Sequence, residues 1–69
     1  MDEAERRDLV GRLFANLTAK LEDAAMLAAE GQGSRQPPER LRSIAAEIAE
    51  NMAEARELSE QVTDLLGQL

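Results

Sequence analysis

Apolar residues recur at alternating spacings of four and three residues through the second half of this chain. No charged residue interrupts the series, and Ser59 is its only polar member. This heptad spacing places every member along one side of an α-helix, which is typical of helices that pack side by side. The series consists of Leu41, Ala45, Ile48, Met52, Ala55, Ser59, Val62, Leu66 and Leu69. The second half of the chain is therefore predicted to form one long helix with an apolar seam.

The first half of the chain carries a second seam with the same spacing. Its members are Val10, Phe14, Leu17, Leu21, Ala24 and Ala28, and it is widened by Leu13 and Leu27. Between the two seams, residues 31–38 contain two glycines and two adjacent prolines. Glycine commonly ends helices, and proline is tolerated in the first turn because the N–H group that it lacks has no partner there. We therefore predict an all-α fold with a single domain over residues 1–69. In it, helices at about 3–30 and 38–66 form an antiparallel hairpin around a turn at 31–37.

Short-range signals support these helix limits. Asp2, with Glu5 three residues later, is typical of a capping box at the start of the first helix, and Gly67 stands where the second helix is expected to end. Oppositely charged residues four positions apart predict surface ion pairs along the helices. These pairs are Glu3 with Arg7, Asp8 with Arg12, and Arg56 with Glu60.

Folding the chain about this turn pairs positions whose numbers sum to about 69. In that register Leu21 faces Ile48 and Leu17 faces Met52, so the two seams pack against each other. The predicted intrachain seam includes Val10, Phe14, Leu17, Leu21, Leu41, Ile48 and Met52. The same register places Val62 opposite Arg7, so the end of the second helix lies beside the charged segment 3–8.

The apolar end of the second helix therefore lacks a partner within the predicted hairpin. Its residues are Leu58, Val62, Leu65, Leu66 and Leu69. A fully buried aliphatic side chain contributes ~1.5–3 kcal/mol, so five approach the ~5–15 kcal/mol stability of a whole domain. We expect a second copy of the chain to cover this stripe, giving a homodimer or higher homo-oligomer built as a four-helix bundle. A larger protein is the alternative partner.

Composition bears on several other classes of function. The sequence contains no Cys and no His, so we expect no enzyme, no cofactor and no metal site. A net charge of −6 and a single aromatic residue argue against nucleic acid as a partner, because nucleic-acid binding usually needs a basic surface or stacking rings. No apolar run approaches the ~20 residues of a membrane span. We therefore expect a cytoplasmic protein that does not contact a membrane.

Two groups of charged residues are candidate ligand sites. Acidic residues recur along the second helix at Glu47, Glu50, Glu54, Glu57 and Asp64. We expect these carboxylates to face solvent opposite the seam, because di-metal helical bundles also use histidine. The predicted turn is surrounded by Arg35, Arg40 and Arg42. We expect these arginines to pair with nearby acids rather than to hold a phosphate.

The sequence thus predicts a non-enzymatic helical interaction module that self-associates through its heptad seam, as an adaptor or regulator. One alternative is an accessory subunit or chaperone that docks a larger protein through the C-terminal apolar stripe. A further alternative is a bundle dimer that regulates RNA through the arginines near the turn. Solution mass separates the first two, and salt-sensitive binding to nucleic acid would be required for the third.

Overall fold

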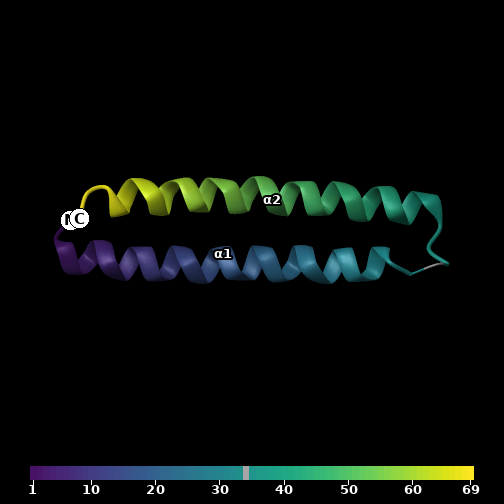
Figure 1. Ribbon diagram of the computed structural model, residues 1–69, viewed down its shortest axis with the longest axis horizontal. Helices are drawn as coiled ribbons and strands as arrows, with labels where there is room; N and C mark the ends of the chain where they lie inside the picture. Colours follow the sequence, from purple (N-terminus) through teal and green to yellow (C-terminus); the bar gives the residue numbers. More distant parts are fainter. Residues whose placement is uncertain (34) are drawn as a thin grey trace.

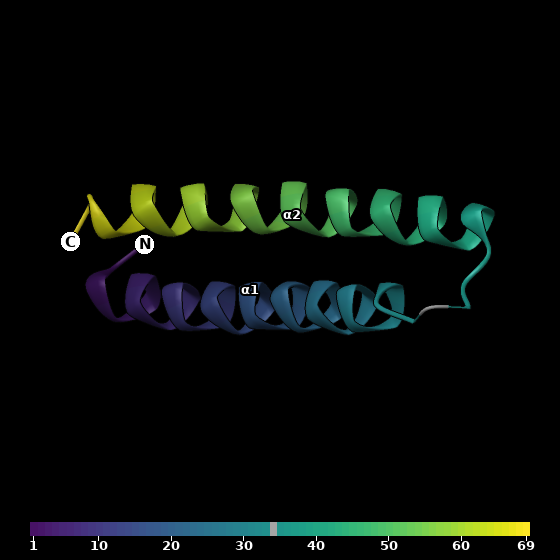
Figure 2. The same cartoon turned by 45° about the vertical axis from the view of Figure 1, so that its right-hand side comes forward.

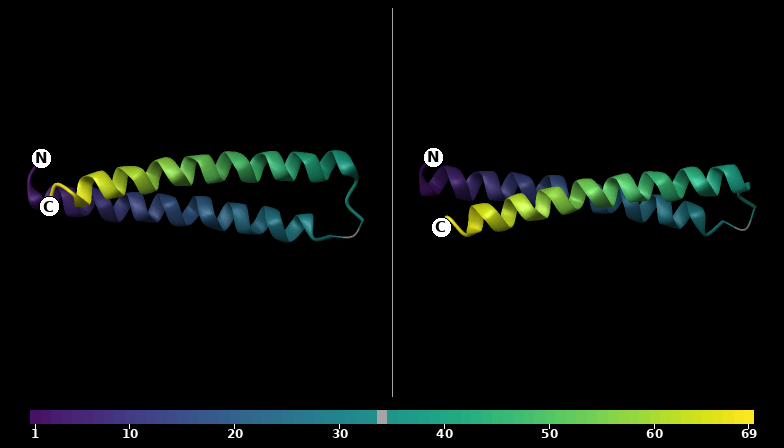
Figure 3. Two further views of the ribbon diagram at one scale, coloured as in Figure 1. Left: turned by 45° about the horizontal axis from the view of Figure 1, so that its top comes forward. Right: turned by 90° about the horizontal axis from the view of Figure 1, so that it is seen from above.

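The computed structural model describes residues 1–33 and 35–69, which form two helices, α1 (Glu3–Gly31) and α2 (Pro38–Leu66). The helices lie side by side and run in opposite directions, with both chain termini at one end and the turn at the other (Figures 1, 2 and 3). The hairpin measures 52 × 14 × 12 Å. The predicted helical hairpin is confirmed, and its helix limits are correct to within one residue. Ser34, within the predicted turn, lies outside the described residues.

The helix ends follow from local chemistry. The Asp2 carboxylate accepts a hydrogen bond of 2.8 Å from the backbone N–H of Glu5, which provides a partner for one of the free N–H groups at the start of α1. Pro38 is the first residue of α2, as expected of a proline after a turn. Among the described residues no glycine has a positive φ. The ends at Gly31 and Gly67 therefore do not depend on a left-handed glycine.

The core is a thin seam between the two helices. Its buried residues are Val10, Leu13 and Ala24 of α1, and Ile44, Ala55 and Val62 of α2. We assign heptad position a to residues 10, 17, 24 and 31 of α1 and to residues 41, 48, 55, 62 and 69 of α2. Position d, three residues after a, then comprises residues 13, 20 and 27 of α1 and 44, 51, 58 and 65 of α2. We call the contact made by these a and d positions, without the exposed Leu41 and Leu69, the hairpin seam.

The register of the hairpin seam differs from the predicted one. Val62 lies in one buried cluster with Val10 and Leu13, and a Cβ atom placed on Gly31 would lie 3.6 Å from Cγ2 of Ile44. The numbers of neighbouring positions thus add to 72–75 rather than about 69. Figure 1 shows the first turn of α2 reaching beyond the last turn of α1. The prediction that Val62 faces a charged residue is wrong, because α2 is displaced along α1 by three to six positions from the predicted register and Val62 packs on Val10 and Leu13.

Four residues of the predicted intrachain seam lie outside it. Val10 is buried, and Leu17 and Ile48 are half-buried in the seam as predicted. The exposed four, with their exposed fractions, are Phe14 (48%), Leu21 (47%), Leu41 (40%) and Met52 (40%). The predicted seam combined each a position with the residue four positions later, whereas the structure combines it with the residue three positions later. The two series share their a positions, so periodicity alone does not distinguish them.

Candidate interaction face

The residues that follow each a position by four form an exposed apolar band. This position, e in the heptad, lies about 40° around the helix from a, on the side away from d. Because α1 and α2 are antiparallel, the e positions of both helices fall on the same side of the hairpin. We call this band, together with the two exposed a positions at the ends of α2, the outer face. It consists of Phe14, Leu21 and Ala28 of α1, of Leu41, Ala45, Met52, Ser59 and Leu66 of α2, and of Leu69 just after α2, all of them exposed.

The outer face is a second apolar surface beside the one that the hairpin buries. Ser59 is the only polar residue among its members. The hairpin seam holds more large aliphatic side chains, but it also contains a lysine and an asparagine at d positions, Lys20 and Asn51, and both are half-buried. Packing of the two helices therefore leaves a stripe of apolar residues on each of them in contact with water.

Hydroxyl groups beside the outer face already have hydrogen-bond partners within their own helices. The Thr18 hydroxyl donates to the backbone carbonyl of Phe14, and the Thr63 hydroxyl donates to that of Ser59, both at 3.0 Å. Covering a polar group costs free energy mainly when the group loses its hydrogen bonds. These threonines could therefore be covered by another apolar surface at little cost.

Ion pairs that connect distant positions lie on the other side of the hairpin, where the g positions and the d residue Lys20 meet. Lys20 pairs with Glu54 across the two helices. Arg40 donates a hydrogen bond of 2.6 Å from Nε to Oε2 of Glu30, and its Nη1 lies 3.7 Å from Oε2 of Glu47. The hydrogen bond from Lys20 to Glu54, together with the charge of that carboxylate, raises the pKa of Lys20. The ion pairs that connect α1 with α2 thus lie on the side of the hairpin away from the outer face.

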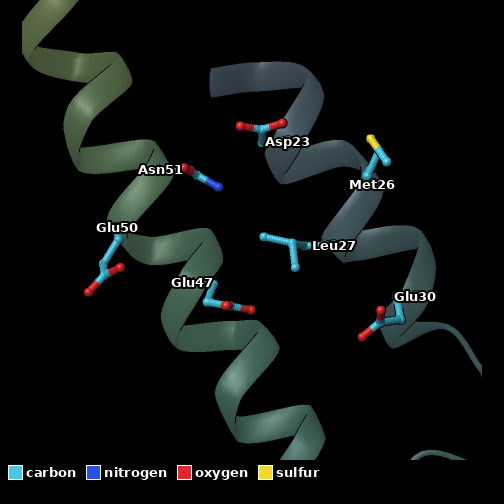
Figure 4. Close-up of a pocket in the computed structure, with 7 residues that line it drawn as sticks. All are labelled: Asp23, Met26, Leu27, Glu30, Glu47, Glu50 and Asn51. Carbon is cyan, nitrogen blue, oxygen red and sulfur yellow. The ribbon is translucent and has the colours of Figure 1, made fainter. Parts of the chain in front are cut away.

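An open hollow lies between the helices on this charged side, near the turn. Figure 4 shows Leu27 and Asn51 pointing into the space between α1 and α2, whereas Glu50 and Met26 point away from it. Its remaining lining residues are acidic, at Asp23, Glu30 and Glu47. Across residues 1–33 and 35–69, no three acidic side chains come close enough together to hold a metal ion.

The predicted C-terminal stripe is divided by the structure. Val62 is buried in the hairpin seam, and Leu58 and Leu65 pack beside it. The apolar surface of these three residues is therefore largely covered within the chain. Leu66 and Leu69 remain 48% and 45% exposed and belong to the outer face. The exposed apolar surface is therefore not confined to the end of α2, because it extends along both helices.

The charged groups follow the predictions in part. The three local ion pairs are confirmed, with shortest N–O distances of 3.1 Å for Arg7–Glu3, 3.4 Å for Arg12–Asp8 and 3.2 Å for Arg56–Glu60. The acids of α2 are exposed as predicted, but Glu47 and Glu54 flank the hairpin seam and pair with cations instead of pointing directly away from it. Arg40 pairs with nearby acids as expected, and Arg35 and Arg42 are exposed.

Sequence reasoning placed Phe14, Leu21 and Met52 inside the hairpin and so missed them as surface residues. The signal that could have located them is the width of the apolar stripe. Both helices carry apolar residues at a, d and e, which is three positions per heptad, whereas a two-helix contact uses only a and d. Leu13, which is predicted only to widen the seam, is in fact buried within it, as is Ile44 of α2.

In the part of the chain that the structure describes, neither helix has a stretch long and apolar enough to cross a lipid bilayer. Comparisons with models of known protein families, with curated protein sequences and with solved structures find no match to this chain.

Proposed function

We propose that this protein is a non-enzymatic helical interaction module that self-associates through its outer face. Two hairpins pack face to face to form a four-helix bundle, and the homodimer acts as an adaptor or regulator. In this assembly the a and e positions of all four helices point toward the centre of the bundle, while a and d hold each hairpin together. A stripe of three apolar positions per heptad is the pattern of a helix that packs in such a bundle.

The observation that carries this proposal is the second apolar surface. A hairpin that exists alone needs only one apolar seam between its helices, because burial of apolar area is the main favourable contribution to folding. This hairpin buries one seam, which includes Lys20 and Asn51, and leaves Phe14, Leu21 and Met52 exposed beside it. Covering the outer face with a second apolar surface removes these side chains from water.

The size of the hairpin supports the same assembly. A surface of 52 by 14 Å has an area of about 700 Å², close to the ~800 Å² that each partner contributes to a standard protein interface. Within the described residues no large side chain is less than 2% exposed, so the hairpin has no fully enclosed core. Chains of this length usually need a staple or a partner to be stable, and the sequence has no cysteine for a disulfide.

Two glutamine substitutions on the outer face test the proposal. Leu21→Gln and Met52→Gln together should convert the dimer to a monomer, since both residues are exposed in the hairpin and would be covered only in the bundle. Light scattering after size exclusion measures the mass, and circular dichroism measures the remaining helix. Met26→Gln is the matched control, because Met26 is 72% exposed and lies off the outer face.

The proposal fails if the double variant keeps the mass of the parent protein. A parent protein that is already a folded monomer would also contradict self-association. That second result would favour the docking of a larger protein on the same face.

A further inference from the structure

We propose that the two hairpins pair with their turns at the same end of the bundle, so that α1 of each copy lies against α2 of the other. This inference rests on the proposed self-association and specifies its geometry. The alternative places the turns at opposite ends, with α1 against α1 and α2 against α2. Both arrangements cover the outer face, but they bring different residues together.

In the same-end arrangement, the register of the hairpin fixes which residues meet. A two-fold axis along the hairpin keeps every residue at its own height, so the helices of different copies cannot slide past each other. Within one hairpin, Leu13 lies beside Val62 and Gly31 beside Ile44, so positions at equal height have numbers that add to about 75. The same sum identifies the residues that meet between copies.

Side-chain sizes are complementary at these heights. The middle of α1 presents the large residues Leu17 and Leu21, which would meet Ser59 and Ala55 of the second copy. Farther toward the turn, α1 presents Ala24 and Ala28, which would meet Met52 and Ile48 of the second copy. Large residues thus face small ones in successive layers, as a close-packed core requires.

Charges at the margin of the outer face distinguish the two arrangements. Glu22 of α1 and Arg56 of α2 lie beside the outer face at heights that differ by about three residues, or ~4.5 Å, and both are exposed. In the same-end arrangement Glu22 of each copy approaches Arg56 of the other, giving two attractive pairs. In the opposite-end arrangement, α1 of one copy can slide along α1 of the other. The position at which Leu21 and Met52 both meet small residues places Glu22 of one copy close to Glu22 of the other. Opposite charges favour the first arrangement, and like charges oppose the second.

Spin labels at the turn measure the arrangement directly. The sequence contains no cysteine, so Arg35→Cys provides one labelling site per chain. Neighbouring helices in a bundle lie ~8–10 Å apart, so two labels at the same end should be separated by less than about 35 Å. Labels at opposite ends would be separated by a distance close to the 52 Å length of the hairpin. Glu57→Cys, near the middle of the hairpin, is the control, because its labels are close together in both arrangements.

A long distance in a sample with the mass of a dimer overturns the same-end arrangement and leaves the proposed self-association intact. A monomer mass with no intermolecular distance overturns both.

A charge exchange provides a second, independent readout. Glu22→Arg and Arg56→Glu should each raise the dimer dissociation constant by roughly threefold to thirtyfold, because each loses two symmetric pairs. Arg56→Glu also removes the pair between Arg56 and Glu60 within the helix, so the loss from this single variant has two causes. The variant that combines Glu22→Arg with Arg56→Glu restores opposite charges between the copies, and it should recover much of the affinity in the same-end arrangement. Additive losses would overturn that arrangement.

Discussion

Leu13 and Phe14 are adjacent in the sequence but lie on different surfaces, and the proposed assembly predicts different consequences of truncating them. Leu13 is 8% exposed and belongs to the buried cluster between α1 and α2, whereas Phe14 is 48% exposed on the outer face. Leu13→Ala should therefore weaken the hairpin itself. Phe14→Ala should weaken the association of two hairpins and affect the isolated hairpin much less.

The magnitudes follow from burial. Leu→Ala in a protein core costs ~2–5 kcal/mol, and we expect the lower end, about 2 kcal/mol, in this thin seam. Full burial of a Phe side chain is worth ~1.5–3 kcal/mol, and about half of Phe14 is already covered within the hairpin. Covering the rest contributes about 1 kcal/mol per copy, or about 2 kcal/mol per dimer. Phe14→Ala should thus raise the dimer dissociation constant by roughly 30-fold.

Thermal unfolding followed by circular dichroism across a dilution series separates the two effects. The stability of a dimer depends on protein concentration, whereas that of a monomeric hairpin does not. Leu13→Ala should lower the melting temperature at every concentration. Phe14→Ala should lower it at high concentration and approach the parent protein at the lowest concentration. Equal losses for both variants at the lowest concentration would refute the assignment of Phe14 to an outer face.

Two further predictions concern individual residues. The pKa of Lys20 is raised, so its pairing with Glu54 adds stability below pH 10.5, and this stability is lost as pH rises through the higher folded-state pKa. Urea unfolding should therefore show a loss of stability at alkaline pH in the parent protein and not in Lys20→Arg. An equal loss in both proteins would contradict this prediction. A Cβ atom on Gly11 would meet nothing within 4 Å, so Gly11→Ala should stabilise the dilute protein by ~1 kcal/mol, and a lower melting temperature would contradict this placement.

The helices were predictable because their signals are local. The hydrogen bond between Asp2 and Glu5 and the three ion pairs at i,i+4 depend only on residues within one turn of helix. Pro38 marks the start of α2 for an equally local reason, since its missing N–H group has no partner in the first turn. Each of these features would exist in almost any packing of the two helices.

The packing was not predictable from the same signals. Position a is common to two apolar series, so residues such as Ala55 and Val62 are expected in the seam in either case. The choice between Leu13 and Phe14 depends on how far both helices rotate about their axes, which periodicity does not determine. The axial offset is also non-local, because it depends on contacts between the two helices, such as the packing of Val62 with Val10. The pair between Lys20 and Glu54 depends on that register, so no local pattern of residues indicates it.

The most direct test of self-association is the absolute mass of the unmodified protein in solution, measured by light scattering after size exclusion over a dilution series. The account predicts a mass of twice 7.6 kDa at high concentration, with helical content retained. A folded protein that has the mass of a single chain at every concentration would contradict it.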